Sequence, residues 1–286
     1  MSNETYAFKV GDIECFAIND GTFAYEAPLI SAPADSLFAN APKKLLYEAL
    51  NQHGIQPEKW MAFVSPFTCL SVDTGRHMVL ADTGAGSSTP KTGRLLQNLQ
   101  TVGIEAGDID IVILTHAHED HVGGNTDATG KPAFPKARYV MSKEEWAFWT
   151  SEQPEALYED EDFTFIRRSL LSIGRQLDLV EREAEIVPGV RALAAPGHTP
   201  GHMVVALSSN GEQLLCIGDA FIHPIHIEHP EWHTSFDMAP ERLLATRRVL
   251  LNKAASEKAL MLASHFPFPG LGHVVLRGAG WQWKPI

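Results

Sequence analysis

The chain has 286 residues, of which 44% are hydrophobic and 20% are charged, a composition typical of a globular protein with its own core. A formal net charge of −12 argues against nucleic acid as a partner, because a phosphate backbone requires a positively charged surface. No apolar stretch approaches the roughly 18 residues of a membrane span. The first ten residues lack a signal-peptide pattern. We therefore expect a cytoplasmic protein with no membrane partner.

The cysteines Cys15, Cys69 and Cys216 are spread singly through the chain, each in an apolar context. An odd number without paired spacing argues against a disulfide framework. We expect all of them to be reduced core residues.

Short β-like runs separated by turn signals open the chain. They lie at 8–10, 13–18, 67–72 and 77–81. Between them, the polar and proline-punctuated excursion 28–60 is predicted to carry a helix over 43–51, where Leu45, Leu46 and Leu50 line one face. Another helix is predicted over 93–101, and an apolar strand over 111–114 follows it.

Strands and helices are mixed less regularly in the second half. Further strands are predicted at 139–141, 190–194, 203–207, 214–217 and 259–262, with two more at the end of the chain. One helix is predicted directly after Ser142, which can cap it. Two more helices are predicted over 160–176 and over 240–255. This order indicates a layered α/β chain rather than regular βαβ alternation. No linker interrupts it, so we predict one domain over 1–286.

The run His116-Ala117-His118-Glu119-Asp120-His121 follows the apolar strand 111–114 directly. Imidazole and carboxylate groups converging in one loop are the ligands that a cation such as zinc prefers. The alternation of His116 and His118 suits an extended segment, so Asp120 and His121 point elsewhere. Two groups of ligands from one loop predict two metal ions rather than one.

Three further ligand-type residues occupy equivalent positions along the chain. His198, Asp219 and His265 each follow an apolar strand, and glycine or serine lies just before each of them. Such a repeated pattern of strand and ligand is what an active site at the carboxyl edge of a sheet requires. The sequence therefore predicts that these side chains meet the histidine-rich loop.

With these residues, the chain resembles the metallo-β-lactamase superfamily. The matching motifs are the segments 80–84, 115–124, 196–202, 218–219 and 264–265. The resemblance implies an α+β fold, a four-layer αββα sandwich with a dinuclear site between the sheets. It assigns one metal to His116, His118 and His198, a second to Asp120, His121 and His265, and the bridging position to Asp219. It also implies that Asp82 orients a ligand histidine.

A hydrolytic mechanism follows from this resemblance. Two divalent ions, zinc by preference but also manganese, iron or cobalt, would share a hydroxide that attacks a carbonyl carbon or a phosphorus. Asp120 and Asp219 are the catalytic candidates, and Asp120 is a candidate to carry a proton to the leaving group. No serine or cysteine nucleophile is required.

The C-terminal segments 264–274 and 280–285 resemble the methyl parathion hydrolase branch, to which quorum-quenching lactonases are near relatives. This resemblance implies a homodimer that hydrolyses a small ester, lactone or phosphotriester. Related lactonases place a tyrosine three residues after the bridging aspartate, where this chain has Ile222. The alternatives are a glyoxalase II-like thioesterase, a non-catalytic metal-binding protein on the same fold, and a mononuclear iron enzyme.

An apolar wall for the substrate is predicted from aromatic and aliphatic side chains. The residues are Trp149, Phe165, Phe221, Ile222 and Phe236. For Trp149, core packing of an amphipathic helix is an equal alternative.

More histidines follow Asp219, namely His223, His226, His229 and His233. They could form a third metal site, but a position flanking the pocket or on a proline-broken loop is favoured.

Overall fold

The computed structural model describes residues 4–152 and 160–286, and these residues form two mixed seven-stranded sheets. The first sheet has the order β1 (Thr5–Val10), β2 (Ile13–Glu26), β3 (Ala62–Asp73), β4 (Met78–Ala81), β5 (Ile111–Ile113), β6 (Arg138–Ser142) and β7 (Leu177–Val180). The second runs β14 (Gly280–Pro285), β13 (Leu271–Arg277), β12 (Leu260–Leu262), β11 (Glu212–Cys216), β10 (Met203–Ser209), β9 (Val190–Ala194) and β8 (Glu183–Val187). Strands β4 to β7 are parallel, as are β11 and β12, and the other pairs are antiparallel.

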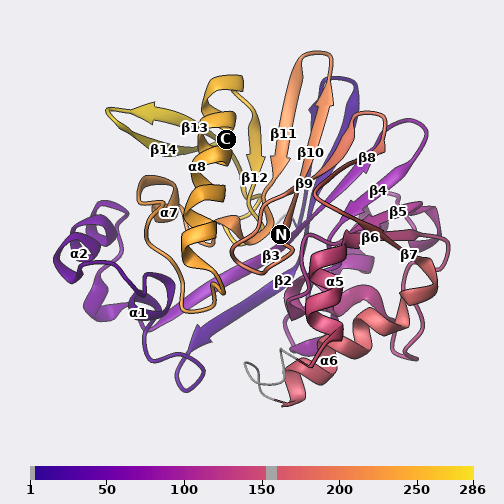
Figure 1. Ribbon diagram of the computed structural model, residues 1–286, viewed down its shortest axis with the longest axis horizontal. Coiled ribbons are helices and arrows are strands. Elements are labelled where there is room, and N and C mark those ends of the chain that lie inside the picture. Colours follow the sequence, from indigo (N-terminus) through magenta and orange to yellow (C-terminus); the bar gives the residue numbers. More distant parts are fainter. Residues whose placement is uncertain (1–3, 153–159) are drawn as a thin grey trace.

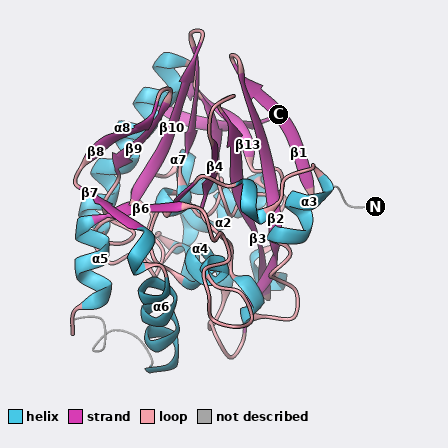
Figure 2. Ribbon diagram, turned by 90° about the vertical axis from the view of Figure 1, so that its right-hand side faces the viewer, coloured by secondary structure: helices cyan, strands magenta, loops and turns pink. Residues whose placement is uncertain are grey.

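Helices cover the outer faces of both sheets (Figures 1 and 2). The helices of the described residues are α1 (Pro33–Leu37), α2 (Lys43–Gln52), α3 (Leu95–Thr101), α4 (Glu119–Val122), α5 (Lys143–Thr150), α6 (Asp160–Ser172), α7 (Ile225–Glu228) and α8 (Pro240–Glu257). Residues of α3, α5 and α6 pack on the first sheet, and residues of α8 pack on the second. The predicted four-layer αββα sandwich is confirmed.

Strand alternation explains the layers, because successive side chains of a strand point to opposite faces. In β4, Val79 and Ala81 pack between the two sheets, whereas Leu80 packs against the helices. All three are at most 1% exposed. Strands buried on both faces read as continuous apolar runs, which is why the sequence reveals them.

Within the described residues, the structure has no helix that is both long and apolar enough to cross a membrane.

The strands β2 and β3 extend further than the sequence predicts. Their pairing continues to Glu26 and Ala62, beyond an irregularity between Asn19 and Thr22. The extension forms a two-stranded ribbon that reaches toward α1 (Figure 1). The turn-like tripeptide at 19–21 and the half-exposed side chains that follow explain why the prediction ended at residue 18.

The predicted N-terminal excursion 28–60 begins just beyond this ribbon and contains α1 and α2. Its apolar side chains, among them Leu37 and Leu50, join a core cluster with Ile222, Ile225 and Trp232. The excursion is therefore packed against the loop that follows Asp219. The structure also adds β7, β8, α4 and α7, which were not predicted, and confirms the helix over 43–51 as α2.

Candidate metal centre

The predicted ligands meet at one edge of the sandwich. The histidine-rich loop follows β5, His198 follows β9, Asp219 follows β11 and His265 follows β12. Because the carboxyl ends of these strands lie at the same edge, residues more than 140 positions apart in the sequence converge there. The structure thus brings together all seven predicted ligands, in two groups of donor atoms.

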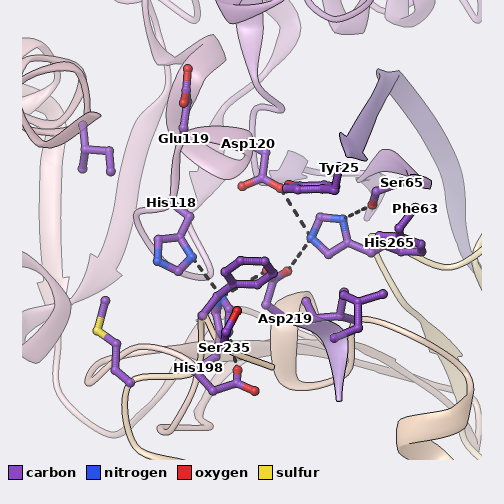
Figure 3. Close-up of a pocket in the computed structure, with 16 residues that line it drawn as sticks. Tyr25, Phe63, Ser65, His118, Glu119, Asp120, His198, Asp219, Ser235 and His265 are labelled. Carbon is purple, nitrogen blue, oxygen red and sulfur yellow. Dashed lines mark hydrogen bonds and ion pairs between the residues drawn. The ribbon is translucent and has the colours of Figure 1, made fainter. Parts of the chain in front are cut away.

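The first donor group consists of His116, His118, His198 and Asp219, whose ligand atoms lie within 4.8 Å of one another. His118 Nδ1 lies 3.1 Å from His116 Nε2 and 2.9 Å from His198 Nε2. Asp219 Oδ2 lies 3.2 Å from His198 Nε2 and 3.7 Å from His116 Nε2. Three imidazole nitrogens therefore lie together beside a carboxylate oxygen. Figure 3 shows two of these rings, those of His118 and His198, with Asp219.

The second donor group consists of Asp120, His121 and His265. The other oxygen of Asp219, Oδ1, lies 3.0 Å from His121 Nε2 and 2.9 Å from His265 Nε2. Asp120 Oδ2 lies 3.5 Å from His265 Nε2 on the same side (Figure 3). Each oxygen of Asp219 thus faces a different donor group, which is the arrangement of a bridging carboxylate.

Asp82 contacts the Nδ1 side of His121, where the resemblance leads us to expect an orienting carboxylate. Its Oδ2 lies 2.7 Å from His121 Nδ1, and both carboxylate oxygens also accept hydrogen bonds from Thr115. Asp82 has φ +61°, a backbone conformation that is uncommon for residues other than glycine. Its hydrogen bonds stabilise this conformation, so the Nε2 of His121 is left facing Asp219.

Asp237 has the same role for His198, although the sequence did not point to it. Its Oδ1 lies 2.7 Å from His198 Nδ1, and its Oδ2 accepts a hydrogen bond from the Thr234 amide at 2.7 Å. The buried Arg247 lies 3.8 Å from the same carboxylate. A carboxylate behind a ligand histidine fixes the ring orientation and raises its basicity. The signal missing from the sequence is the contact itself, which joins residues 39 positions apart.

Two further residues that the sequence did not single out hold the ligand loops. Ser65 Oγ lies 2.8 Å from His265 Nδ1. The fully buried carboxylate of Glu145 accepts hydrogen bonds from the Ala117 amide at 3.0 Å and the Gly201 amide at 2.9 Å. Glu145 therefore ties the loop of His116 to the loop of His198. The sequence predicts a helix capped by Ser142, and that cap is confirmed, but it does not predict these contacts of Glu145.

Glycine is required immediately before Asp219. Gly218 has φ +48°, and a Cβ atom there would lie 2.7 Å from His202 Nε2 and 3.1 Å from Thr115 Oγ1. His202 in turn accepts a hydrogen bond from the Asp219 amide at 3.0 Å. The tight turn therefore allows the backbone to approach the ligand loops and presents the Asp219 carboxylate to both donor groups.

The electrostatics of the site favour a cation. Burial lowers the pKa of both His116 and His118 well below the ordinary value, which leaves neutral imidazoles able to bind a metal. Burial alone would raise the pKa of Asp219, but the surrounding imidazoles of His265 and His121 hold it well below its usual range. Asp219 is therefore an ionised carboxylate, the form that binds a metal ion.

The donor set fits divalent metal ions. His121 Nε2 and Asp219 Oδ1 are buried and make no hydrogen bond within the described residues, although they lie 3.0 Å apart. Buried polar atoms of this kind normally have a partner. Nitrogen and carboxylate donors in this number suit zinc, and they also suit manganese, iron and cobalt.

A cavity of about 540 Å³ opens over the donor atoms. Two of the predicted wall residues, Ile222 and Phe236, line it. Trp149 instead lies fully buried beside His118, with its indole nitrogen donating to Glu145, so the alternative of core packing holds. Phe165 packs against the core of the first sheet, and Phe221 against the core of the second. The sequence did not predict Tyr25 and Phe63, which come from the ribbon and complete the wall.

Tyr25 belongs to β2, and its side chain points into the cavity (Figure 3). Burial and then the negative charges of Asp120 and Asp219 raise the pKa of Tyr25 well above its ordinary value. The phenol is therefore a neutral hydrogen-bond donor within the pH range in which proteins are folded.

The additional histidines form no third group of metal-type donors within the described part of the chain. His226 Nε2 lies 2.9 Å from the carbonyl oxygen of Leu37, and His229 stacks on Trp232 with ring centroids 3.8 Å apart. His223 is buried against Phe38, and His233 lies 2.9 Å from the Thr234 carbonyl oxygen. Their contacts are structural, which agrees with the favoured prediction of a position flanking the pocket.

Known proteins resemble the chain along most of its length. N-acyl homoserine lactonase AiiA of Bacillus thuringiensis subsp. kurstaki is 27% identical over 222 residues, covering 70% of this chain and 81% of that protein. N-acyl homoserine lactonase AiiB of Agrobacterium fabrum is 26% identical and covers 72% of each chain.

Solved structures extend the likeness to the whole chain. AidC, a dizinc quorum-quenching lactonase solved with a product, superposes with a TM-score of 0.88 at 29% identity, covering 100% of this chain and 99% of that one. The hydrolase AbOPH gives a TM-score of 0.86 at 26% identity, with coverages of 100% and 98%. The family model of the metallo-beta-lactamase superfamily matches residues 68–265. Because this match spans more than half of the chain, the chain belongs to the metallo-beta-lactamase superfamily.

Proposed function

We propose that this metal-dependent hydrolase opens neutral lactone rings and that N-acyl homoserine lactones are its substrate class. One observation carries the proposal: two donor groups share Asp219 at the base of a cavity, on a chain that matches a dizinc lactonase over its whole length. The curated relatives named N-acyl homoserine lactonase support the same substrate class.

Two zinc ions would occupy the donor groups. His116, His118 and His198 would hold one ion, Asp120, His121 and His265 the other, and Asp219 would contact both. When bound, such ions activate water for attack and polarise the carbonyl oxygen of the substrate. Among the donors, the Asp120 side chain is more exposed to the cavity than that of Asp219, at 16% against 5%. Asp120 is therefore the carboxylate placed to pass a proton to the leaving ring oxygen.

The charge of the cavity favours a neutral substrate. Its described lining contains the carboxylates of Glu119, Asp120, Asp219 and Asp237 and neither lysine nor arginine. An anionic substrate such as a glutathione thioester would lack a basic partner there, which argues against the thioesterase alternative. The apolar wall, which includes Phe63, Ile222 and Phe236, suits an acyl chain beside the uncharged ring.

A substrate panel tests the proposal on zinc-loaded protein. The panel contains N-hexanoyl and N-decanoyl homoserine lactones, an aryl ester, an aryl phosphotriester and a glutathione thioester, and metal content is counted on the same sample. We expect about two zinc ions per chain and the highest kcat/KM on the lactones. Phosphotriester turnover above lactone turnover would place the activity in the methyl parathion hydrolase branch instead. Bound metal with no turnover of any substrate would favour the non-catalytic alternative.

Three further proposals accompany this function. We propose that residues 1–286 form a single domain, because the two sheets share one core between them. We also propose a homodimer, because the resemblance to the methyl parathion hydrolase branch implies one. We propose a cytoplasmic location on the basis of the composition. Light scattering after size-exclusion chromatography would test the dimer, and a monomer at micromolar concentration would contradict it.

A further inference from the structure

Opening a lactone ring creates negative charge on oxygen atoms of the substrate. One water molecule adds across the ring C–O bond, with its hydroxyl going to the carbonyl carbon and its hydrogen to the ring oxygen. Hydrogen-bond donors aimed at the oxygen where charge develops lower the barrier to such a reaction. A side chain that assists ring opening would therefore offer a hydrogen-bond donor that no neighbouring residue already engages.

Most polar groups around the cavity cannot supply such a donor. The lining carboxylates only accept hydrogen bonds when ionised, and the lining imidazoles of His118, His198 and His265 belong to the donor groups. Hydroxyl groups remain, and within the described lining they belong to Tyr25, Ser65 and Ser235. The hydroxyl of Ser65 is engaged, since it lies 2.8 Å from His265 Nδ1.

Of the two remaining hydroxyl groups, that of Tyr25 lies on the side of the cavity that holds Asp120 and His265 (Figure 3). After burial, the negative charge of Asp120 has the largest effect in raising the pKa of the Tyr25 phenol, followed by that of Asp219. Figure 3 shows the Tyr25 ring extending toward Asp120 from the ribbon side of the cavity. Asp120 is also the residue proposed to deliver a proton to the leaving ring oxygen.

The ring of Tyr25 is held in place by other aromatic side chains. Phe23 meets it edge-on with centroids 4.9 Å apart, Phe63 stacks on it at 6.1 Å, and Phe236 lies at 6.2 Å. Phe63 is also its directly paired partner across β2 and β3. A donor fixed in this way loses little entropy when a substrate binds. Ser235 has no comparable support, and Ile222 supplies no donor from the loop after Asp219.

We propose that Tyr25 is a catalytic residue whose phenol donates a hydrogen bond to the ring oxygen of the lactone as the C–O bond breaks. The inference rests on the proposed lactonase function and adds a residue to it. The phenol keeps its own proton throughout, and the proton that the ring oxygen gains comes from the added water by way of Asp120. The β2–β3 ribbon thereby contributes chemistry as well as a wall.

The substitution Tyr25→Phe removes the hydroxyl and keeps the ring. We expect kcat on N-hexanoyl homoserine lactone to fall about 10- to 100-fold, with KM changed less than about twofold. An aryl ester with a 4-nitrophenolate leaving group needs no such donor, because its leaving group is already a weak base. Its kcat should fall less than about threefold. Zinc content and melting temperature should equal those of the wild type, since no ligand or core contact is lost.

Tyr6→Phe is the matched control, because it removes a phenol hydroxyl in β1, outside the described cavity lining, and its kcat on the lactone should stay within about twofold of wild type. Equal losses on lactone and aryl ester, or a Tyr25→Phe lactone rate within twofold of wild type, would overturn the role of Tyr25 while leaving the lactonase proposal intact. A wild-type protein with no lactone turnover would overturn both. A loss of bound zinc in Tyr25→Phe would also overturn the role proposed here.

Discussion

The metal centre and the cavity wall are built in different ways. Four histidines of the centre have their second ring nitrogen within hydrogen-bond distance of a side-chain oxygen, as Asp82 lies beside His121 and Asp237 beside His198. The wall comes instead from the ends of β2 and β3, from α1 and from the loop after Asp219, and Phe236 is 36% exposed. Side-chain hydrogen bonds therefore hold the rings of the centre, whereas the pairing of β2 with β3 and side-chain packing position the wall. Substitutions in the two regions should have separable effects.

The largest effect is expected from the residue that joins the two donor groups. Asp219→Asn keeps the size of the side chain but removes the negative charge that faces both groups. We expect a loss of more than about 100-fold in lactone turnover, because even residues behind the ligands contribute 10- to 100-fold. Metal content should fall below two ions per chain. Metal analysis of the purified variant beside the turnover assay would decide this.

A variant that retains both metals and most of its activity would show that Asp219 does not bridge. The matched control is Asp127→Asn, which alters an aspartate in the exposed turn before Gly130, where its carboxylate bonds to Thr129. We expect wild-type metal content and turnover from this control, since the turn lines no part of the described cavity wall.

The next largest effect is expected from the carboxylates behind the ligands. Asp82→Asn and Asp237→Asn each place an amide NH₂ where a carboxylate now accepts more than one hydrogen bond. We expect zinc affinity to fall about 10- to 100-fold in each variant, measured by competition with a chromogenic chelator. If Asp237→Asn bound zinc as tightly as the wild type, the carboxylates behind the ligand histidines would not determine how tightly the centre binds zinc.

The sequence predicted which residues meet at the candidate centre, because histidine and aspartate at strand ends carry a chemical signature of their own. His198, Asp219 and His265 each follow an apolar strand, and parallel or neighbouring strand ends meet at one edge whatever the loops do. Asp237 and Ser65 carry no such signature. Their roles depend on hydrogen bonds to His198 and His265 across 39 and 200 residues, which only the folded structure defines.

The wall could be predicted only in part for a related reason. Ile222 and Phe236 lie close to Asp219 in the chain, so proximity pointed to them. Trp149 is drawn into the core by its hydrogen bond to Glu145, which helical spacing does not reveal. Tyr25 was missed because the half-exposed β2 extension after the irregularity at Asn19 gives no clear strand pattern.

A smaller effect, on stability rather than chemistry, is expected from the link between the ligand loops. Glu145→Gln turns one acceptor oxygen into an NH₂ group that faces the amide of Ala117 or Gly201. Because the site is fully buried, we expect the free energy of unfolding to fall by about 1–3 kcal/mol. Urea denaturation would measure it, with Glu144→Gln, on the exposed side of the same helix, as the control. An unchanged midpoint would show that the loops do not depend on this carboxylate.

The smallest effect is expected from the wall itself. Phe236→Ala removes a ring that lines the cavity and contacts Tyr25, but about a third of the residue is already exposed. The substitution would remove roughly 40 Å² of apolar contact with the substrate, which should weaken the free energy of binding by about 1 kcal/mol. KM for N-decanoyl homoserine lactone should therefore rise about fivefold, since 1.4 kcal/mol corresponds to tenfold. A short acyl chain does not reach as far along the wall, so KM for N-butanoyl homoserine lactone should change little, and zinc content should stay the same. Equal increases for both chain lengths would mean that Phe236 acts on the ring or on Tyr25 rather than on the acyl chain, and a loss of zinc would mean that wall and centre are not independent.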